Sequence, residues 1–109
     1  MQAVILASKK SETINSAGFA IPKAMIPLAG KPYLEHVLEN LPEYSEEVVL
    51  VVGYRGDMIK QHFGDYFCGR ELRYVWQFQT DDTDGAMRRA AKILHAENLS
   101  VFDIDEIEI

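Results

Sequence analysis

Histidine and cysteine are the residue types best able to bind a metal ion or attack a substrate, and this chain has few of them. His36, His62 and His95 each stand alone in a segment that we predict to be helical. No His-x-x-x-His or Cys-His spacing occurs, and zinc sites need such clustered ligands. The single cysteine, Cys68, follows Phe67 with no histidine close by in the sequence, whereas a reactive thiolate needs an activating neighbour. The sequence therefore predicts neither a zinc site nor a cysteine nucleophile.

Two adjacent lysines, Lys9 and Lys10, follow an apolar run at residues 2–7 after a single serine. That run predicts a buried parallel strand, and we expect the polar residues 8–20 behind it to form a loop. In α/β sheets, ligands bind beyond the carboxyl ends of the strands, at the point where strand order reverses. Residues 8–20 are therefore the first place to look for function.

The elements that must position these residues alternate between strand-like and helix-like segments. Short runs rich in apolar, β-branched or aromatic residues predict four strands, at residues 2–7, 47–52, 72–78 and 99–104. Apolar residues at helical spacing predict three helices, at residues 31–41, 57–63 and 83–96. Residues 21–30 hold two prolines and a glycine and are expected to be irregular. The alternation predicts a three-layer α/β domain, with a parallel sheet covered by helices on both faces.

Length and composition are those of one soluble globular domain. The chain has 109 residues, of which 48% are hydrophobic and 26% charged, enough for a single core. A net charge of −6 argues against nucleic acid as a partner, because binding a polyanion needs clustered Lys and Arg. One cysteine excludes an internal disulfide, and we expect a reducing, cytoplasmic compartment. Residues 1–7 lack the features of a signal peptide, and no apolar stretch nears the ~20 residues of a membrane span.

Three segments resemble the sugar-1-phosphate nucleotidyltransferases, such as the glucose-1-phosphate thymidylyl- and mannose-1-phosphate guanylyltransferases. The first is the opening strand, and the second is Pro-Lys-Ala-Met-Ile-Pro-Leu-Ala-Gly-Lys-Pro at residues 22–32, similar to the family block P-K-P-M-(L/I)-P-(V/L)-(A/G)-G-(K/R)-P. The third is Val-Val-Leu-Val-Val-Gly-Tyr at residues 48–54. The likeness covers nearly the whole chain and corresponds to the N-terminal, nucleotide-binding half of the family. It implies a Rossmann-like sheet of strand order 3-2-1-4, truncated relative to the family.

The resemblance also implies a reaction. In the family, a sugar 1-phosphate attacks the α-phosphate of a nucleoside triphosphate, and an NDP-sugar and pyrophosphate are released. Such chemistry is mainly positioning and charge neutralisation by Lys, Arg and Mg²⁺, so Mg²⁺ is the expected cofactor wherever a nucleotide binds. The half that binds the sugar phosphate in the family has no counterpart that we can identify here.

The family's phosphate loop, G-x-G-T-R, is degenerate in this chain. A gapless register places Lys9 and Ser11 on the glycines, Glu12 on the threonine and Thr13 on the arginine. Glycines let the backbone approach phosphate, whereas a carboxylate about 4 Å from a phosphate charge costs about 4 kcal/mol at an effective dielectric constant of about 20. The loss predicts a non-catalytic domain. The alternative is that Lys9 and Lys10 replace the arginine, as flexible charges without its bidentate fork.

The other candidate nucleotide-binding residues also come from the resemblance. Lys23 aligns with a family lysine that meets substrate phosphate, and it is the one candidate catalytic residue; the alternative is a surface lysine after a proline. Gln77 aligns with a glutamine that faces the nucleobase. Thr83 and Gly85 remain from the family's G-T-A-G, although the acidic residues around Thr83 equally suit a helix N-terminus.

Asp105 aligns with a family aspartate that binds Mg²⁺. One or two carboxylates together with substrate phosphates can hold Mg²⁺, but the family's second metal aspartate lies in a region that has no counterpart here. The alternative is an acidic terminus that keeps an edge strand soluble.

Three functions stay open. The favoured one is a degenerate, non-catalytic module that contacts a partner or a regulatory ligand. Its predicted fourth strand, at residues 99–104, is a possible unpaired edge, and such edges tend to pair with another chain, which predicts a homo-oligomer or a partner chain. The second is a nucleotidyltransferase, alone or as half of a split enzyme, supported by Lys23, Gln77 and Asp105. The third is a nucleotide sensor without catalysis.

Overall fold

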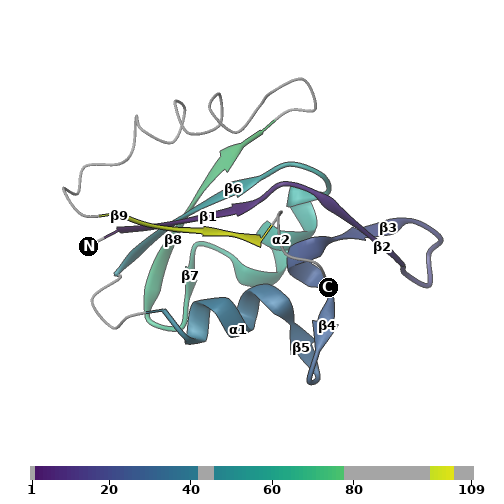
Figure 1. Cartoon of the computed structure of the whole chain (residues 1–109), viewed down its shortest axis with the longest axis horizontal. Helices are drawn as coiled ribbons and strands as arrows, with labels where there is room; N and C mark the ends of the chain where they lie inside the picture. Colours follow the sequence, from purple (N-terminus) through teal and green to yellow (C-terminus); the bar gives the residue numbers. More distant parts are fainter. Residues whose placement is uncertain (1, 42–45, 78–98, 105–109) are drawn as a thin grey trace.

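A mainly parallel β-sheet forms the centre of the molecule (Figure 1). The structure, a computed structural model, describes residues 2–41, 46–77 and 99–104. Within these ranges the sheet has five strands in the order β7-β8-β6-β1-β9. Their bounds are β1 (Gln2–Ala7), β6 (Glu47–Val52), β7 (Tyr66–Phe67), β8 (Arg70–Trp76) and β9 (Leu99–Asp103).

Four of these strands are the predicted ones, and they lie in the predicted order. The parallel pairs are β8 with β6, β6 with β1 and β1 with β9, which is the order 3-2-1-4. The predicted strand at residues 72–78 begins two residues earlier, at Arg70, and the last strand ends at Asp103 rather than at residue 104. The family fold is therefore confirmed for the part of the sheet that the structure describes.

The short strand β7 was not predicted. It runs antiparallel to β8, with Tyr66 opposite Glu71 and Phe67 opposite Arg70. The two-residue connection has positive φ at both Cys68 (54°) and Gly69 (74°), the conformation that tight hairpins need. The exposed Cys68 is therefore part of a turn.

Each face of the sheet carries a cluster of buried side chains. One cluster consists of Val4, Leu6, Val49, Val51 and Val75. The other face carries a larger cluster that includes side chains from two helices, α1 (Tyr33–Glu39) and α2 (Gly56–Phe63). Figure 1 shows both helices on the same side of the sheet. The third predicted helix, at residues 83–96, lies outside the described residues.

Both described helices agree with the apolar pattern of the sequence. Leu34 and Leu38 of α1 and Ile59 and Phe63 of α2 face the core and are 0–3% exposed. The helix α1 is shorter than predicted, because Lys31 and Pro32 form the strand β5 (Lys31–Pro32) instead of a first helical turn. Within the described ranges, no helix has the length and apolar character needed to cross a membrane.

The expected loop at residues 8–20 is wrong, because this segment forms most of a β-hairpin. The strand β2 (Lys10–Ile14) pairs antiparallel with β3 (Ala20–Pro22). The side chain of Asn15 holds the turn, since its Oδ1 accepts hydrogen bonds from the N–H groups of Ala17 (3.0 Å) and Phe19 (3.3 Å). Gly18 supplies the positive φ of 91°, which glycine adopts without strain.

Residues 21–30 were expected to be irregular, but most of them lie in short regular elements. Ile21 and Pro22 end β3, and they are followed by one turn of 3-10 helix, η1 (Lys23–Met25), and by the strand β4 (Pro27–Leu28), which pairs with β5. The turn between β4 and β5 has positive φ at Ala29 (52°) and Gly30 (85°).

Candidate functional site

Ser8, Gly53 and Gln77 are far apart in the sequence but lie close together, each just beyond the carboxyl end of a strand. The three strands are β1, β6 and β8. Tyr54 donates its N–H to the carbonyl oxygen of Ser8 (2.9 Å), and Gln77 donates its N–H to that of Val52 (2.7 Å). Between them lies Gly53, where an added Cβ would stand 2.8 Å from the Gln77 oxygen and 3.0 Å from the Ser8 oxygen. Only glycine suits this close approach of backbones. The predicted ligand edge of the sheet is thus a tightly packed junction.

The β2–β3 hairpin leads away from this junction and stands where the glycine loop was expected (Figure 1). Ser11, at the position of a family glycine, is only 7% exposed. Its Oγ donates to the carbonyl oxygen of Ile21 (2.8 Å) and accepts from the N–H of Thr13 (3.1 Å). The Ser11 side chain therefore locks the two strands of the hairpin together.

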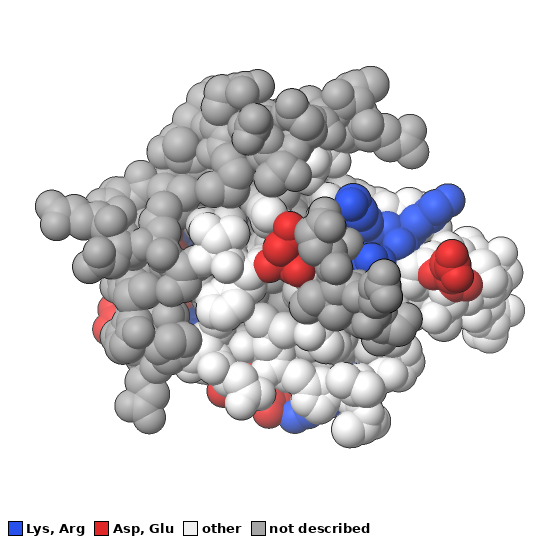
Figure 2. All heavy atoms as spheres, in the orientation of Figure 1, with Lys and Arg blue, Asp and Glu red and all other residues white. Residues whose placement is uncertain are grey.

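The hairpin also sets the position of the lysines. Lys23 donates its N–H to the carbonyl oxygen of Lys9 (3.1 Å), and Lys10 lies opposite Pro22 in the ladder. Lys9 and Lys10 are exposed and Lys23 is half-buried. Figure 2 shows basic side chains gathered at the base of the hairpin, with acidic side chains to either side. The hydrogen bond between their backbones thus places Lys9 and Lys23, two predicted nucleotide-binding residues, next to each other. The ammonium groups of lysines attract anions.

The residues that replace the family's threonine and arginine lie on the outside of the hairpin. Glu12 and Thr13 are both exposed on β2, and the N–H of Thr13 is taken by Ser11. The register of the resemblance predicts an arginine at position 13, where this chain has the uncharged hydroxyl of Thr13. The carboxylate of Glu12 and the N–H of Thr13 therefore belong to a strand of the hairpin and not to a phosphate-binding turn.

Sequence reasoning missed the clamp that fixes this hairpin to the sheet. The hydroxyl of Tyr54 donates to the carbonyl oxygen of Ala20 (2.6 Å), and the guanidinium of Arg55 lies 4.4 Å from the centroid of the Phe19 ring. Arg55 adopts a left-handed conformation with φ 50° and pairs with Asp57 at 3.5 Å. The sequence showed these residues only as a strand-to-helix turn, because nothing in it links them to a segment more than thirty residues earlier.

Gln77 lies at the site, but Thr83, Gly85 and Asp105 fall outside the described residues. Gln77 is half-buried and continues the β8 ladder toward β6. The three other candidates remain predictions from the resemblance.

The described residues offer little to hold a metal ion. Across residues 2–41, 46–77 and 99–104, no three His, Cys, Asp or Glu side chains are grouped closely enough for this purpose. Asp103, two residues before Asp105, has a buried Oδ1 atom with no hydrogen-bond partner in the described part of the chain. A single carboxylate needs the phosphates of a bound nucleotide to complete a Mg²⁺ site.

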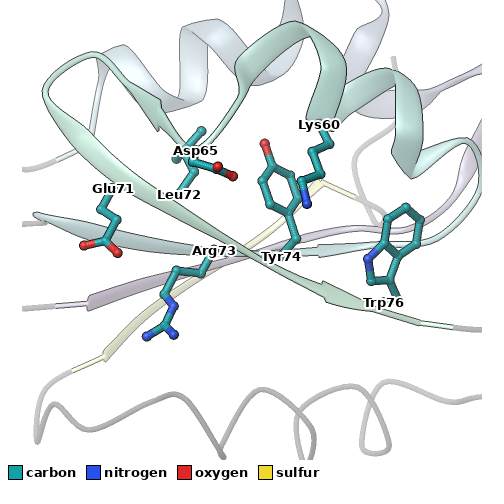
Figure 3. A pocket seen from close by; sticks show the side chains of 7 residues that line it. All are labelled: Lys60, Asp65, Glu71, Leu72, Arg73, Tyr74 and Trp76. Atoms are coloured by element: carbon teal, nitrogen blue, oxygen red, sulfur yellow. The ribbon is translucent and has the colours of Figure 1, made fainter.

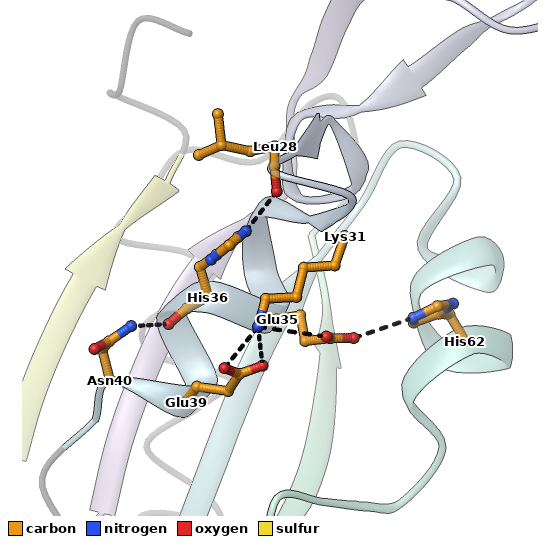
Figure 4. Close-up of polar contacts among 7 residues, drawn as sticks. All are labelled: Leu28, Lys31, Glu35, His36, Glu39, Asn40 and His62. Atoms are coloured by element: carbon orange, nitrogen blue, oxygen red, sulfur yellow. Dashed lines mark hydrogen bonds and ion pairs between the residues drawn. The ribbon is translucent and has the colours of Figure 1, made fainter.

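Two of the histidines belong to a polar network around α1 (Figure 4). Nε2 of His36 is 2.6 Å from the carbonyl oxygen of Leu28, and Nε2 of His62 is 3.8 Å from Oε1 of Glu35. Lys31 donates to both carboxylate oxygens of Glu39 (2.6 and 2.7 Å), which lowers the pKa of that carboxyl. These contacts join α1 to the β4–β5 hairpin and to α2.

A separate hollow of about 430 Å³ lies beside β8 and α2 (Figure 3). Burial, helped by the charge of Asp65, raises the pKa of Tyr74 to about 12. The hydroxyl of Tyr74 donates to the carbonyl oxygen of Gly64 (2.6 Å), and Lys60 lies 5.5 Å from the ring centroid. The described residues that line the hollow are Lys60, Asp65, Glu71, Leu72, Arg73, Tyr74 and Trp76, so Lys9, Lys23 and Gln77 are not among them.

Comparison with known proteins agrees with this geometry. The family described as "MobA-like NTP transferase domain" matches residues 3–101. The D-glycero-alpha-D-manno-heptose 1-phosphate guanylyltransferase of Campylobacter jejuni is 34% identical over an alignment of 111 residues, gaps included. The alignment covers 96% of this chain and 50% of that protein. The bifunctional protein GlmU of Methanococcus maripaludis is 31% identical over 99 residues, covering 91% of this chain and 23% of that protein.

A solved structure gives the same result. HddC from Yersinia pseudotuberculosis, complexed with GMP-PN, superimposes with a TM-score of 0.79 at 26% identity, and the match covers 95% of this chain and 47% of that one. This chain spans about half the length of the heptose 1-phosphate guanylyltransferases that it matches. From its sequence, its sheet order and these matches, the chain belongs to the MobA-like NTP transferase domain family and is a nucleotidyltransferase-like α/β domain.

Proposed function

We propose that this chain is a non-catalytic member of its family, which acts by contact with a partner chain rather than by nucleotidyl transfer. The observation that carries the proposal is the hydrogen-bonded hairpin in place of the glycine loop. In that hairpin the Ser11 hydroxyl bridges the Ile21 carbonyl and the Thr13 amide.

A phosphate site at this position needs free backbone N–H groups and a fixed positive charge. Here the N–H of Thr13 is bound to Ser11, and the N–H of Lys23 is bound to the carbonyl of Lys9. Opening the hairpin would break these bonds, and each hydrogen bond of this kind contributes about 1 kcal/mol. The hairpin therefore opposes the arrangement that would grip pyrophosphate.

A nucleotide sensor is the second candidate, and it is favoured by the lysines at the base of the hairpin. Lys9, Lys10 and Lys23 gather there on a chain whose net charge is −6. A nucleoside triphosphate bound at this point would bring Mg²⁺ with it, and Lys23 would contact a phosphate. The structure of the HddC relative with GMP-PN supports a nucleotide as the ligand class.

Pyrophosphate release tests the proposal. The chain is incubated with Mg²⁺, each common nucleoside triphosphate and a set of sugar 1-phosphates that includes the heptose 1-phosphate. We expect no pyrophosphate above the protein-free background, whereas the full-length Campylobacter jejuni relative serves as the positive control. Turnover by the chain alone would refute the non-catalytic assignment.

A variant that rebuilds the family's phosphate loop provides a second test of the non-catalytic assignment. Lys9→Gly, Ser11→Gly, Glu12→Thr and Thr13→Arg together rebuild G-x-G-T-R. We expect the restored variant to bind a nucleoside triphosphate more tightly than the natural chain in calorimetry, by about tenfold or more for a gain of about 1.4 kcal/mol. For the sensor, the natural chain itself would show a thermal shift with nucleotide that Lys23→Ala removes.

A further inference from the structure

Arg55 has a backbone conformation that residues with a Cβ rarely adopt, and it lies in a turn of the candidate site. Its φ is 50° and its ψ is 38°, in the left-handed region. The N–H of Gly56 donates to the carbonyl oxygen of Gly53 (3.1 Å), so Arg55 is the third residue of a tight turn, where a positive φ normally calls for glycine or asparagine. The two other non-glycine residues with positive φ in the described ranges, Ala29 and Cys68, lie in two-residue hairpin turns. Arg55 instead joins a strand to a helix.

The two neighbours of Arg55 are both held in place. On one side, the hydroxyl of Tyr54 donates to the carbonyl oxygen of Ala20 in the β2–β3 hairpin (2.6 Å). On the other side, Gly56 lies against the ring of Trp76, so closely that an added Cβ would be 2.6 Å from a ring carbon. Figure 3 shows this ring pointing from β8 toward α2. A residue stays in an unfavourable conformation only where the surrounding structure fixes it, and these contacts fix the turn.

The side chain of Arg55 contacts the hairpin and the helix at the same time. Its guanidinium lies 4.4 Å from the centroid of the Phe19 ring, a distance at which the ring attracts a cation. The same guanidinium pairs with the carboxylate of Asp57, in the first turn of α2, at 3.5 Å. Arg55 therefore links the hairpin to α2 through one side chain.

The start of α2 depends on the shape of this turn. The N–H of Met58 donates to the carbonyl oxygen of Arg55 (3.0 Å), and the N–H of Gly56 donates to that of Gly53. The first N–H groups of a helix have no partner within the helix, and the N-cap residue, Arg55 itself, makes no side-chain hydrogen bond that would cap α2. A change in the backbone of Arg55 would therefore take the partners from the N–H groups of Gly56 and Met58.

We propose that Arg55 couples the β2–β3 hairpin to the first turn of α2. The hairpin, in its observed position, holds Arg55 in the left-handed conformation; when the hairpin lifts away, Arg55 relaxes and the N–H groups of Gly56 and Met58 are released. The inference rests on the proposed function as a module that acts by contact, because it names the element that a contact at the hairpin would affect next. The hairpin suits such a movement, since of the five residues of β2 only Ser11 is buried and few buried contacts favour local opening. An element with two arrangements is what coupling between separate sites requires.

Amide hydrogen exchange of the folded chain, followed residue by residue by NMR, tests the coupling. Phe19→Ala removes the ring beneath the guanidinium, and we expect exchange at Gly56 and Met58 to become about two- to fivefold faster, as the loss of one surface cation–π contact implies. Arg55→Ala should act in the same way, because it removes the guanidinium and keeps the unfavourable φ. Arg55→Gly should not, because glycine adopts a positive φ without strain. Adding Phe19→Ala to Arg55→Gly should then leave both amides unchanged, and the difference between the two backgrounds measures the coupling.

The matched control is Ile14→Ala, which shortens an apolar side chain of the same hairpin that is 60% exposed. It should leave exchange at Gly56 and Met58 as it is in the natural chain, and the NMR spectrum of each variant shows whether it is folded. Unchanged exchange at these two amides in Phe19→Ala would overturn the coupling. Equal exchange in Arg55→Ala and Arg55→Gly would overturn the role of the left-handed conformation. Neither result depends on pyrophosphate release, so a failure here leaves the non-catalytic assignment to its own test.

Discussion

The hydroxyl of Tyr54 donates a hydrogen bond to the carbonyl oxygen of Ala20 at 2.6 Å, across 34 positions of sequence. Tyr54 follows the central strand β6, whereas Ala20 begins the return strand of the β2–β3 hairpin. Next to Tyr54, Arg55 lies over the ring of Phe19. The sheet therefore fixes the position of the β2–β3 hairpin.

Removing that hydroxyl should loosen the hairpin without unfolding the sheet. We expect Tyr54→Phe to lower the free energy of unfolding by about 1 kcal/mol, the usual contribution of one such bond. Amide exchange in the hairpin should become about fivefold faster, as that energy implies if the hairpin opens locally. Tyr66→Phe, at a ring that is 68% exposed, is the control and should change neither quantity. Unchanged exchange in Tyr54→Phe would show that the clamp does not hold the hairpin.

Ser11 should be the most sensitive position within the hairpin. Ser11→Ala removes a hydroxyl that is bonded to both strands and leaves the carbonyl of Ile21 without this donor. We expect a loss of about 1–2 kcal/mol in urea unfolding, because an unsatisfied buried group costs more than a lost exposed bond. Ser16→Ala, in the exposed turn, is the matched control. Equal stability of the two variants would contradict a structural role for the Ser11 hydroxyl.

Gly53 should tolerate no side chain. The Cβ of Gly53→Ala would meet two backbone oxygens, of Gln77 at 2.8 Å and of Ser8 at 3.0 Å, and the backbone at the ends of β8 and β1 cannot move aside cheaply. We expect a loss of about 2–3 kcal/mol, as for other steric overpacking. Gly69→Ala separates this clash from backbone strain, since Gly69 has φ 74° with no atom within 4 Å of the new Cβ, and the left-handed conformation alone costs about 1–2 kcal/mol. If thermal unfolding shows Gly53→Ala to be the milder change, the close approach is not as described.

The sheet was predictable from the sequence because its strands are nearly continuous apolar runs. Val48 to Val52 are all buried, and short apolar runs of this kind, in a chain of alternating elements, are typical of strands in a parallel sheet. The hairpin was not predictable in the same way. Of the five residues of β2 only Ser11 is buried, so the strand carries no hydrophobic alternation that would distinguish it from a loop.

The candidate site was likewise predictable only in part from the sequence. The resemblance identified Lys9, Lys23 and Gln77 as residues of interest, but the bond between the backbones of Lys9 and Lys23 exists only because the hairpin forms. The clamp of Tyr54 on Ala20 joins segments that no local pattern connects. Long-range contacts of polar groups leave no periodic trace in the sequence, whereas burial of apolar side chains does.

The pH dependence of stability should report on Tyr74. Its pKa is raised to about 12, mainly by burial and further by Asp65, from about 10 in an unfolded chain. The folded chain therefore holds this proton more tightly, so the stabilisation is fully present below pH about 10 and is lost as the pH rises toward about 12. We expect the stability difference between the natural chain and Tyr74→Phe to shrink over that interval, as measured by urea unfolding at a series of pH values. In a tyrosinate absorbance titration, the natural chain should show a late phase near pH 12 that Tyr74→Phe lacks. A titration in which Tyr74→Phe leaves the late phase unchanged would mean that the hydroxyl of Tyr74 is not buried against Gly64 in solution.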